Sequence, residues 1–179
     1  MRKRFLGPAL ALLTVAATVL AGTGPVAATP GPIAPRAVTY YEVRAQHSGQ
    51  CLDVKDANPA WGTPDQQWPC WGGSGQLWMK QPVYSSGGHV FYALRVQLNG
   101  LCLDVRDGST AAGAIVQQWD CNSSLGQQWE VWAVGGNYVK VVNRNSGMCL
   151  DVKDISTYNG ATIQQWPCWD NPGQHWWFA

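Results

Sequence analysis

The chain has 179 residues, of which 12 are Lys or Arg and 11 are Asp or Glu, and its net charge is +1. Binding to nucleic acid needs clustered Lys and Arg, whereas these charges are scattered and tryptophan, with 11 residues, is abundant. The composition therefore argues against a nucleic-acid partner. Without an N-terminal signal about 150 residues remain, enough for one well-buried domain and not for a binding domain joined to an enzyme.

The first 28 residues have the order of a secretory signal peptide. Basic residues at 2–4 precede an apolar run from Leu10 to Leu20, and small residues follow at Ala21 and Ala27–Ala28. The run is too short and too interrupted for a membrane-spanning helix, which argues against an uncleaved anchor. We predict cleavage after Ala28, with Ala21 as the alternative. The mature chain would be secreted, extracellular and free of the membrane, with a net charge of −2 because three basic residues are removed.

The rest of the chain contains an internal repeat. Residues 29–37, rich in Pro and Ala, are expected to be a disordered linker, and residues 38–179 a single domain. Segments of 28 residues that begin at Cys51, Cys102 and Cys149 align without a gap, and each contains Cys-Leu-Asp-Val, Gln-Gln-Trp and Gln-x-Trp. We place the three repeats at about residues 38–81, 82–131 and 132–179.

The six cysteines follow the repeat. An exported chain folds in an oxidising compartment, where cysteines form disulfides, and six cysteines allow fifteen pairings. Each repeat has its two cysteines nineteen residues apart, so we predict the bridges Cys51–Cys70, Cys102–Cys121 and Cys149–Cys168. Zinc is not expected, because the chain has no Cys-x-x-Cys pair and its three histidines are far apart in sequence. We predict no metal and no cofactor.

Each repeat has the pattern of four short strands. Residues 42–45, 92–96 and 138–142 alternate apolar and polar side chains before a Ser-Gly or Asn-Gly turn. Cys-Leu-Asp-Val, the segment ending in Gln-Gln-Trp and the segment beginning at Gln-x-Trp supply three more strands, and no segment has a sustained helical period. Four strands cannot bury their own apolar face, so three units must share one core. This predicts an all-β fold, a β-trefoil with pseudo-threefold symmetry.

The Gln-x-Trp motif occurs at residues 76–78, 127–129 and 174–176. Together with the matched Cys-Leu-Asp-Val elements it resembles the signature of ricin B-chain-type lectin domains and family-thirteen carbohydrate-binding modules, over about residues 38–179. One such motif alone would mean little, but three in register are highly specific. The resemblance implies a lectin that binds a glycan or polysaccharide of galactose, arabinose or xylan type, through up to three weak sites that act together.

Each repeat carries the two groups that a sugar site needs. A sugar offers C–H groups on one face, which suit a flat aromatic ring, and hydroxyls at its edge, which must be paired in a dry site. A carboxylate accepts hydrogen bonds from two neighbouring hydroxyls. We predict these pairs to be Asp53 with Trp68, Asp104 with Trp119, and Asp151 with Trp166. The alternative for the aspartates is to cap a turn locally.

The resemblance assigns roles to further residues. It implies a sugar contact from the first glutamine of each Gln-Gln-Trp: Gln66, Gln117 and Gln164. It implies an orienting role for the glutamines that begin Gln-x-Trp: Gln76, Gln127 and Gln174. We expect the tryptophans that end this motif to lie in the core: Trp78, Trp129 and Trp176. We expect the second acids of the repeats to hold the loop after the strand: Asp56, Asp107 and Asp154.

The chain departs from the family pattern at one position in every copy. Ricin-type sites commonly carry Asn just before Gln-x-Trp, where this chain has Gly75, Gly126 and Gly173. Loss of one neutral hydrogen bond costs about 1 kcal/mol, which weakens a site and puts galactose specificity in question. Asn122 or Asn171, shifted along the loop, is the alternative donor.

The copies also differ from one another. Pro64 and Asp65 stand where the other repeats have apolar or β-branched residues, so we expect a distorted strand in the first repeat. The third repeat keeps the turn pair Asn159-Gly160, and we choose it first as an active site. Loop tryptophans lie near the expected sites, where they would widen the stacking platform or cover the bridges: Trp61, Trp71 and Trp169.

Two other classes of function fit the sequence less well. An enzyme acting on glycosides needs paired carboxylates, but pairs such as Asp53 and Asp56 recur in every repeat, as a scaffold motif would, and no Ser-His-Asp or Cys-His combination is recognisable. The alternative to a lectin is a non-catalytic trefoil that binds a protein, as a toxin's cell-binding subunit or an inhibitor, with decayed sugar sites. The Asp and Trp pair present in all three copies favours the lectin.

Overall fold

The computed structural model describes residues 37–179. The expected signal peptide, its cleavage site and nearly all of the expected linker lie outside the described residues. The described chain has four strands in each third: β1 (Tyr41–Ala45), β2 (Cys51–Val54), β3 (Asp65–Trp68) and β4 (Leu77–Ser86); β5 (His89–Val96), β6 (Cys102–Val105), β7 (Val116–Trp119) and β8 (Trp129–Gly135); β9 (Tyr138–Asn143), β10 (Cys149–Val152), β11 (Ile163–Trp166) and β12 (Trp176–Phe178).

The helices of the described chain are single 3-10 turns, two in each repeat. One follows each Cys-Leu-Asp-Val strand and the other contains the glutamine of Gln-x-Trp: η1 (Lys55–Ala57), η2 (Ser74–Gln76), η3 (Arg106–Gly108), η4 (Leu125–Gln127), η5 (Lys153–Ile155) and η6 (Pro172–Gln174). Within residues 37–179 no helix has the length and apolar character needed to cross a membrane.

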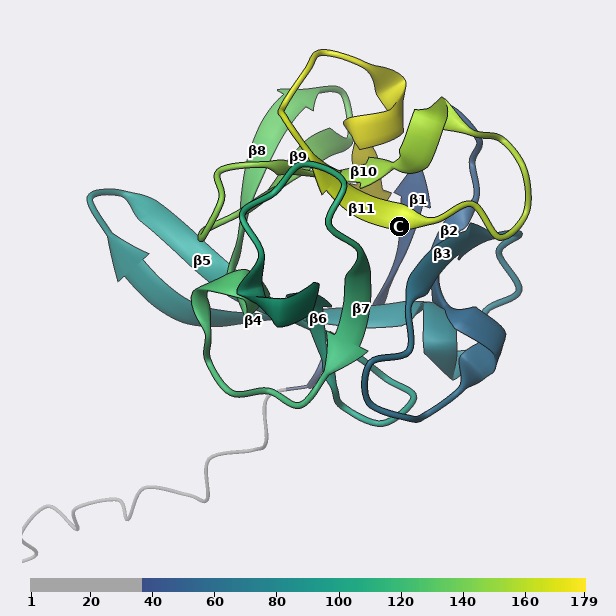
Figure 1. Cartoon of the computed structure of the whole chain (residues 1–179), viewed down its shortest axis with the longest axis horizontal. Helices are drawn as coiled ribbons and strands as arrows, with labels where there is room; N and C mark the ends of the chain where they lie inside the picture. Colours follow the sequence, from purple (N-terminus) through teal and green to yellow (C-terminus); the bar gives the residue numbers. More distant parts are fainter. Residues whose placement is uncertain (1–36) are drawn as a thin grey trace, which may run out of the picture. The chain divides into compact units, whose positions relative to one another are not determined.

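Six strands close a barrel and six form hairpins. Antiparallel pairing runs from β1 to β4, β5, β8, β9 and β12 and returns to β1. The hairpins are β2–β3, β6–β7 and β10–β11. Single bridges join the second strands of these hairpins, Pro64 with Gln117, Ile115 with Gln164 and Thr162 with Gln66, so β3, β7 and β11 surround a common axis (Figure 1). The predicted β-trefoil is confirmed.

The core follows from the alternation of side chains along the hairpin strands. In β2, Leu52 and Val54 are fully buried in the shared apolar core, while Asp53 between them points to the opposite face of the strand. The tryptophans that end Gln-x-Trp have no exposed surface, and each indole Nε1 donates to a main-chain carbonyl of the hairpin. The donors are Trp78 to Leu52 (3.1 Å), Trp129 to Leu103 (3.0 Å) and Trp176 to Leu150 (2.9 Å). Their predicted place in the core is confirmed.

The expected distortion at Pro64 and Asp65 is wrong. β3 keeps the same register with β2 as the corresponding strands of the other repeats, with Val54 opposite Asp65. The ladder here uses only the carbonyl of Pro64, which accepts from the Lys55 N–H at 3.2 Å, as the carbonyls of Ile115 and Thr162 do in the other repeats. A proline nitrogen therefore costs this strand no hydrogen bond.

Three disulfides link the predicted cysteines within each repeat. The bridges are Cys51–Cys70, Cys102–Cys121 and Cys149–Cys168, with Cα–Cα distances of 5.1–5.2 Å, and the described chain has no free cysteine. Such bridges persist in an oxidising compartment. Each ties the start of a hairpin to the loop that follows it, which holds that loop beside the outward face of the hairpin.

Candidate functional site

The hairpin register brings the aspartate, the first glutamine and the tryptophan of each repeat to one face. Asp53 lies opposite Gln66 across the β2–β3 ladder, and Cys51 lies opposite Trp68. Side chains two apart along a strand share a face, so Asp53, Gln66 and Trp68 line up on the side away from the core. The second and third repeats have the same register.

Each aspartate is buried and held by the glutamine opposite. The glutamine Nε2 donates to the carboxylate Oδ2 at 2.8 Å from Gln66 to Asp53, 3.0 Å from Gln117 to Asp104 and 2.8 Å from Gln164 to Asp151. Burial raises the pKa of all three carboxyl groups above 3.8, and the glutamine hydrogen bonds partly offset the rise. These glutamines hold in place the carboxylate that would accept hydrogen bonds from a sugar. This contact with the carboxylate is a second role, beside the direct sugar contact that the sequence predicts for them.

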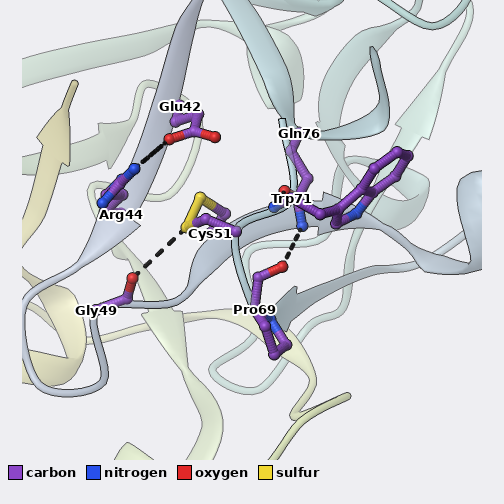
Figure 2. Close-up of polar contacts among 8 residues, drawn as sticks. Glu42, Arg44, Gly49, Cys51, Pro69, Trp71 and Gln76 are labelled. Carbon is purple, nitrogen blue, oxygen red and sulfur yellow. Dashed lines mark hydrogen bonds and ion pairs between the residues drawn. A yellow bond between two sulfur atoms is a disulfide. The ribbon is translucent and has the colours of Figure 1, made fainter. Parts of the chain in front are cut away.

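The glutamine of each Gln-x-Trp braces the loop after the second cysteine. Gln76 is fully buried; its Nε2 donates to the Pro69 carbonyl at 3.1 Å and its Oε1 accepts from the Trp71 N–H at 2.9 Å, with Trp71 beside it in Figure 2. Gln127 and Gln174 make the same two bonds in their repeats. The same glutamines also act on the site aspartates, lowering the pKa of each carboxyl group against the rise that burial causes. One side chain thus couples the loop to the carboxylate, which supports the orienting role.

Two of the three sites are open hollows. In the second repeat a hollow of about 550 Å³ is lined by Asp104, Gln117, Trp119 and Asn122, among others. In the third repeat a hollow of about 410 Å³ is lined by the corresponding Asp151, Gln164 and Trp166, together with Trp169 and Asn171. The indoles that the sequence predicts to stack on sugar are accessible: Trp119 is 37% exposed, Trp68 40%, and Trp166 is partly exposed. Carboxylate and indole meet in each hollow.

In the first repeat the loop tryptophan Trp71 lies over its own loop. The six-membered ring of Trp71 lies directly over Gly73, with ring atoms 1.7–2.3 Å from the place where a Cβ would stand. Only glycine permits this approach. The Trp71 side chain also lowers the pKa of Asp53 against the rise that burial causes, which places this ring beside the acceptor of the first repeat. At the corresponding position of the third repeat Trp169 instead stands edge-on to Trp166, with ring centroids 6.1 Å apart.

A set of glutamines that the sequence reasoning missed joins neighbouring repeats. The second glutamine of each Gln-Gln-Trp, Gln67, Gln118 or Gln165, is fully buried. Gln118 donates to the carbonyls of Asn58 and Ala60 in the first repeat, and Gln165 and Gln67 hold the equivalent loops of the second and third repeats. The presence of this glutamine in all three repeats is the sequence feature that could have identified it. Each site is therefore completed by a loop from another repeat.

Because each site is completed by a loop from another repeat, the reason for choosing the third site, its Asn159-Gly160 turn, is wrong. A Cβ on Gly160 would lie 3.8 Å from the ring of Trp68, so the Asn159-Gly160 turn stands at the first site and not at the third. By the same arrangement Gly62 approaches Trp119 and Gly113 approaches Trp166. Sequence alone places a turn within its own repeat, because the cross-repeat hydrogen bonds are not visible in the pattern.

The asparagines and second acids lie at the rims of the hollows. The Oδ1 atoms of Asn122 and Asn171 accept from main-chain N–H groups two residues on, at 3.0 and 2.9 Å. This fixes the side chains and leaves each Nδ2 as the donor that could replace the missing family asparagine. Asp107 and Asp154 have left-handed backbone (φ 59° and 60°), are exposed and line the same hollows. They stand in the turn, as expected, but within reach of the site.

Comparisons with known proteins agree with the geometry. A family model described as "Ricin-type beta-trefoil lectin domain" matches residues 39–176. The chain is similar to a designed threefold-symmetric protein, ThreeFoil, with 36% identity and a TM-score of 0.73 over 78% of this chain and 97% of that one. It is also similar to part of an exo-β-1,3-galactanase from Clostridium thermocellum, with 30% identity and a TM-score of 0.74 over 80% of this chain.

The galactanase match covers 30% of that enzyme, so this chain corresponds to one portion of it. An earthworm R-type lectin C-half, solved in complex with GalNAc, matches with 22% identity and a TM-score of 0.55 over 77% of this chain and 95% of that one. At this identity the last match supports the fold alone.

Proposed function

The chain belongs to the ricin-type β-trefoil lectin family, and we propose that it is a secreted, non-catalytic lectin in which residues 38–179 bind a glycan or polysaccharide after removal of residues 1–28. The observation that carries the proposal is the hollow of the second repeat, where a glutamine-held carboxylate and an accessible indole face one space. The three disulfides support export, since they need an oxidising compartment.

In this proposal a sugar ring lies with its C–H face on Trp119 and its hydroxyl edge toward Asp104. The carboxylate accepts from two hydroxyls by charge-assisted hydrogen bonds, and the Gln117 amide on Oδ2 holds it in place without reorganisation. Asn122 supplies a donor at the rim. Asp151, Trp166 and Asn171 play the same parts in the third repeat.

Open sites in two repeats make binding multivalent. Individual shallow sites bind weakly because they bury little of a sugar's surface. Two sites on one rigid barrel engage neighbouring residues of a polysaccharide, and effective concentration raises the overall affinity by orders of magnitude. The galactanase match, at 30% identity, supports galactose-type glycans as the first to be tried, with arabinose and xylan types next.

A glycan array tests the proposal. The mature protein is compared with a variant that combines Asp104→Asn, Trp119→Ala, Asp151→Asn and Trp166→Ala, and with Trp132→Ala as the control for loss of an exposed indole on strand β8. We expect binding by the wild type and the control and none by the combined variant. Absence of wild-type signal, or equal signal from the combined variant with an unchanged circular dichroism spectrum, contradicts the lectin and favours the protein-binding alternative.

A further inference from the structure

At the second site two exposed tryptophans lie side by side and come from different repeats, whereas the Trp166–Trp169 pair of the third site comes from a single repeat. Trp61, on the loop of the first repeat, is 61% exposed, and its ring centroid lies 5.8 Å from that of Trp119 with the planes tilted by 55°. Its neighbour Gly62 lines the hollow. The residues that stand in the place of Trp61 in the other repeats are Ala112 and Asn159. Neither carries an aromatic ring.

The loop that carries Trp61 is held on both sides. Gln118 donates to the carbonyls of Asn58 and Ala60 at 2.7 and 2.9 Å, and its own carbonyl accepts from the Gly62 N–H at 2.9 Å. Arg106 donates to the Gly62 carbonyl at 3.3 Å and to Gln117 Oε1 at 2.8 Å. The same arginine thus connects the loop to the glutamine that holds Asp104. The backbone under Trp61 is fixed relative to the carboxylate, although the indole itself is open to solvent.

Gly62 explains how two indoles fit together. Its φ is +78°, and a Cβ at this position would lie 3.2 Å from Cζ3 of Trp119. Glycine lets the loop pass close to the ring, which brings the preceding residue, Trp61, to the edge of the hollow. Gly113 stands in the same relation to Trp166, at 3.5 Å. Ala112 therefore occupies at the third site the place that Trp61 occupies at the second.

We propose that Trp61 and Trp119 form two adjacent stacking subsites, so that the second site binds a linear oligosaccharide of at least two units in preference to a single sugar. This rests on the proposed lectin function. One sugar lies on Trp119 with its hydroxyls on Asp104, and the next unit of the chain lies on Trp61 across the boundary between repeats. The tilt between the rings suits successive units that are rotated about their linkage. Trp61 lines a hollow of about 310 Å³ that shares Gly62 with the hollow of about 550 Å³ lined by Trp119, so the two subsites adjoin.

The test isolates the second site. In a background of Asp53→Asn and Asp151→Asn, calorimetric titrations use galactose and β-1,3-galactotriose, then xylose and xylotriose. We expect the trimer of the bound series to bind about tenfold more tightly than its monomer, as for one added aromatic contact. Trp61→Ala should remove that advantage and leave the monomer affinity within about twofold. Trp177→Ala, which removes an exposed indole on strand β12, is the matched control.

A gain of function completes the test. In a background of Asp53→Asn and Asp104→Asn, which leaves the third site, Ala112→Trp should raise the affinity for the trimer and not for the monomer. If Trp61→Ala weakens monomer and trimer equally, or weakens neither, the two-subsite inference is overturned while the lectin function stands. If the wild type binds no sugar of either series, the proposed glycan classes and this inference fail together.

Discussion

Replacement of Asp65 by valine should stabilise the protein. Asp65 is 1% exposed, and neither carboxyl oxygen has a hydrogen-bond partner. Val116 and Ile163 occupy the same register position in the other hairpins and are fully buried. A buried polar group without a partner costs about 1–3 kcal/mol, and burial of a valine side chain contributes about 1.5 kcal/mol. We expect a gain of about 2–4 kcal/mol in the free energy of unfolding, or roughly 5–15 °C in Tm.

The gain should depend on pH in a defined direction. Burial raises the pKa of Asp65 well above 3.8, and the carboxylates of Asp53 and Asp104 raise it further. The folded state therefore holds this proton more tightly than the unfolded state does. The associated stability is complete below the unfolded pKa of about 4 and is lost as pH rises through the folded pKa. The advantage of Asp65→Val over the wild type should grow from pH 4 to pH 8.

Urea denaturation followed by circular dichroism at several pH values measures both effects. Asp65→Asn is the matched control, because it keeps the shape and the buried polar group but does not titrate. Its stability relative to Asp65→Val should stay constant with pH. Equal stability of the wild type and Asp65→Val at pH 7, or a difference that does not change with pH, would refute the reasoning.

Three further predictions concern the sites. Trp71→Ala should open the first site, so that calorimetry with the bound sugar gains one site per chain; unchanged stoichiometry would show that Trp71 is not the obstacle. Because burial raises the pKa of Asp104 and Asp151, sugar affinity should fall on acidification before pH 3.8 is reached, and constant affinity down to that pH would contradict a carboxylate acceptor. Gln174→Ala leaves two main-chain partners unpaired and should cost about 1–3 kcal/mol in urea denaturation, whereas a loss below about 0.5 kcal/mol would count against the brace.

The fold was accessible from the sequence because the repeat is nearly exact. Three equal cysteine spacings predicted the three bridges, and Gln-x-Trp predicted the core position of Trp78 and its equivalents. The predicted distortion at Pro64 was wrong. The prediction rested on the N–H that proline lacks, but the strand ladder at this residue uses only the proline carbonyl. A strand pattern does not show which main-chain groups the partner strand uses.

The differences between the three sites could not be predicted from the sequence. Asn159 was assigned to the site of its own repeat, and Trp61 only to a loop near the sites, but the hydrogen bonds of Gln67 and Gln118 hold these loops over the sites of other repeats. Contacts of this kind join residues 58–91 positions apart in the sequence, and periodicity does not reveal them. The position of Trp71 over Gly73 in the first repeat likewise depends on the side-chain rotamer and on the shape of the loop.

The most direct test of the account is nuclear magnetic resonance of the tryptophan indoles during titration with the glycan that binds on the array. Each of Trp119 and Trp166 should show nuclear Overhauser effects from its ring protons to the C–H groups of the sugar, and these should disappear with Asp104→Asn and Asp151→Asn respectively. The fully buried indole of Trp129 should show none. Saturable binding without any contact between the sugar and these two rings would contradict the central claim that carboxylate and indole act as one site.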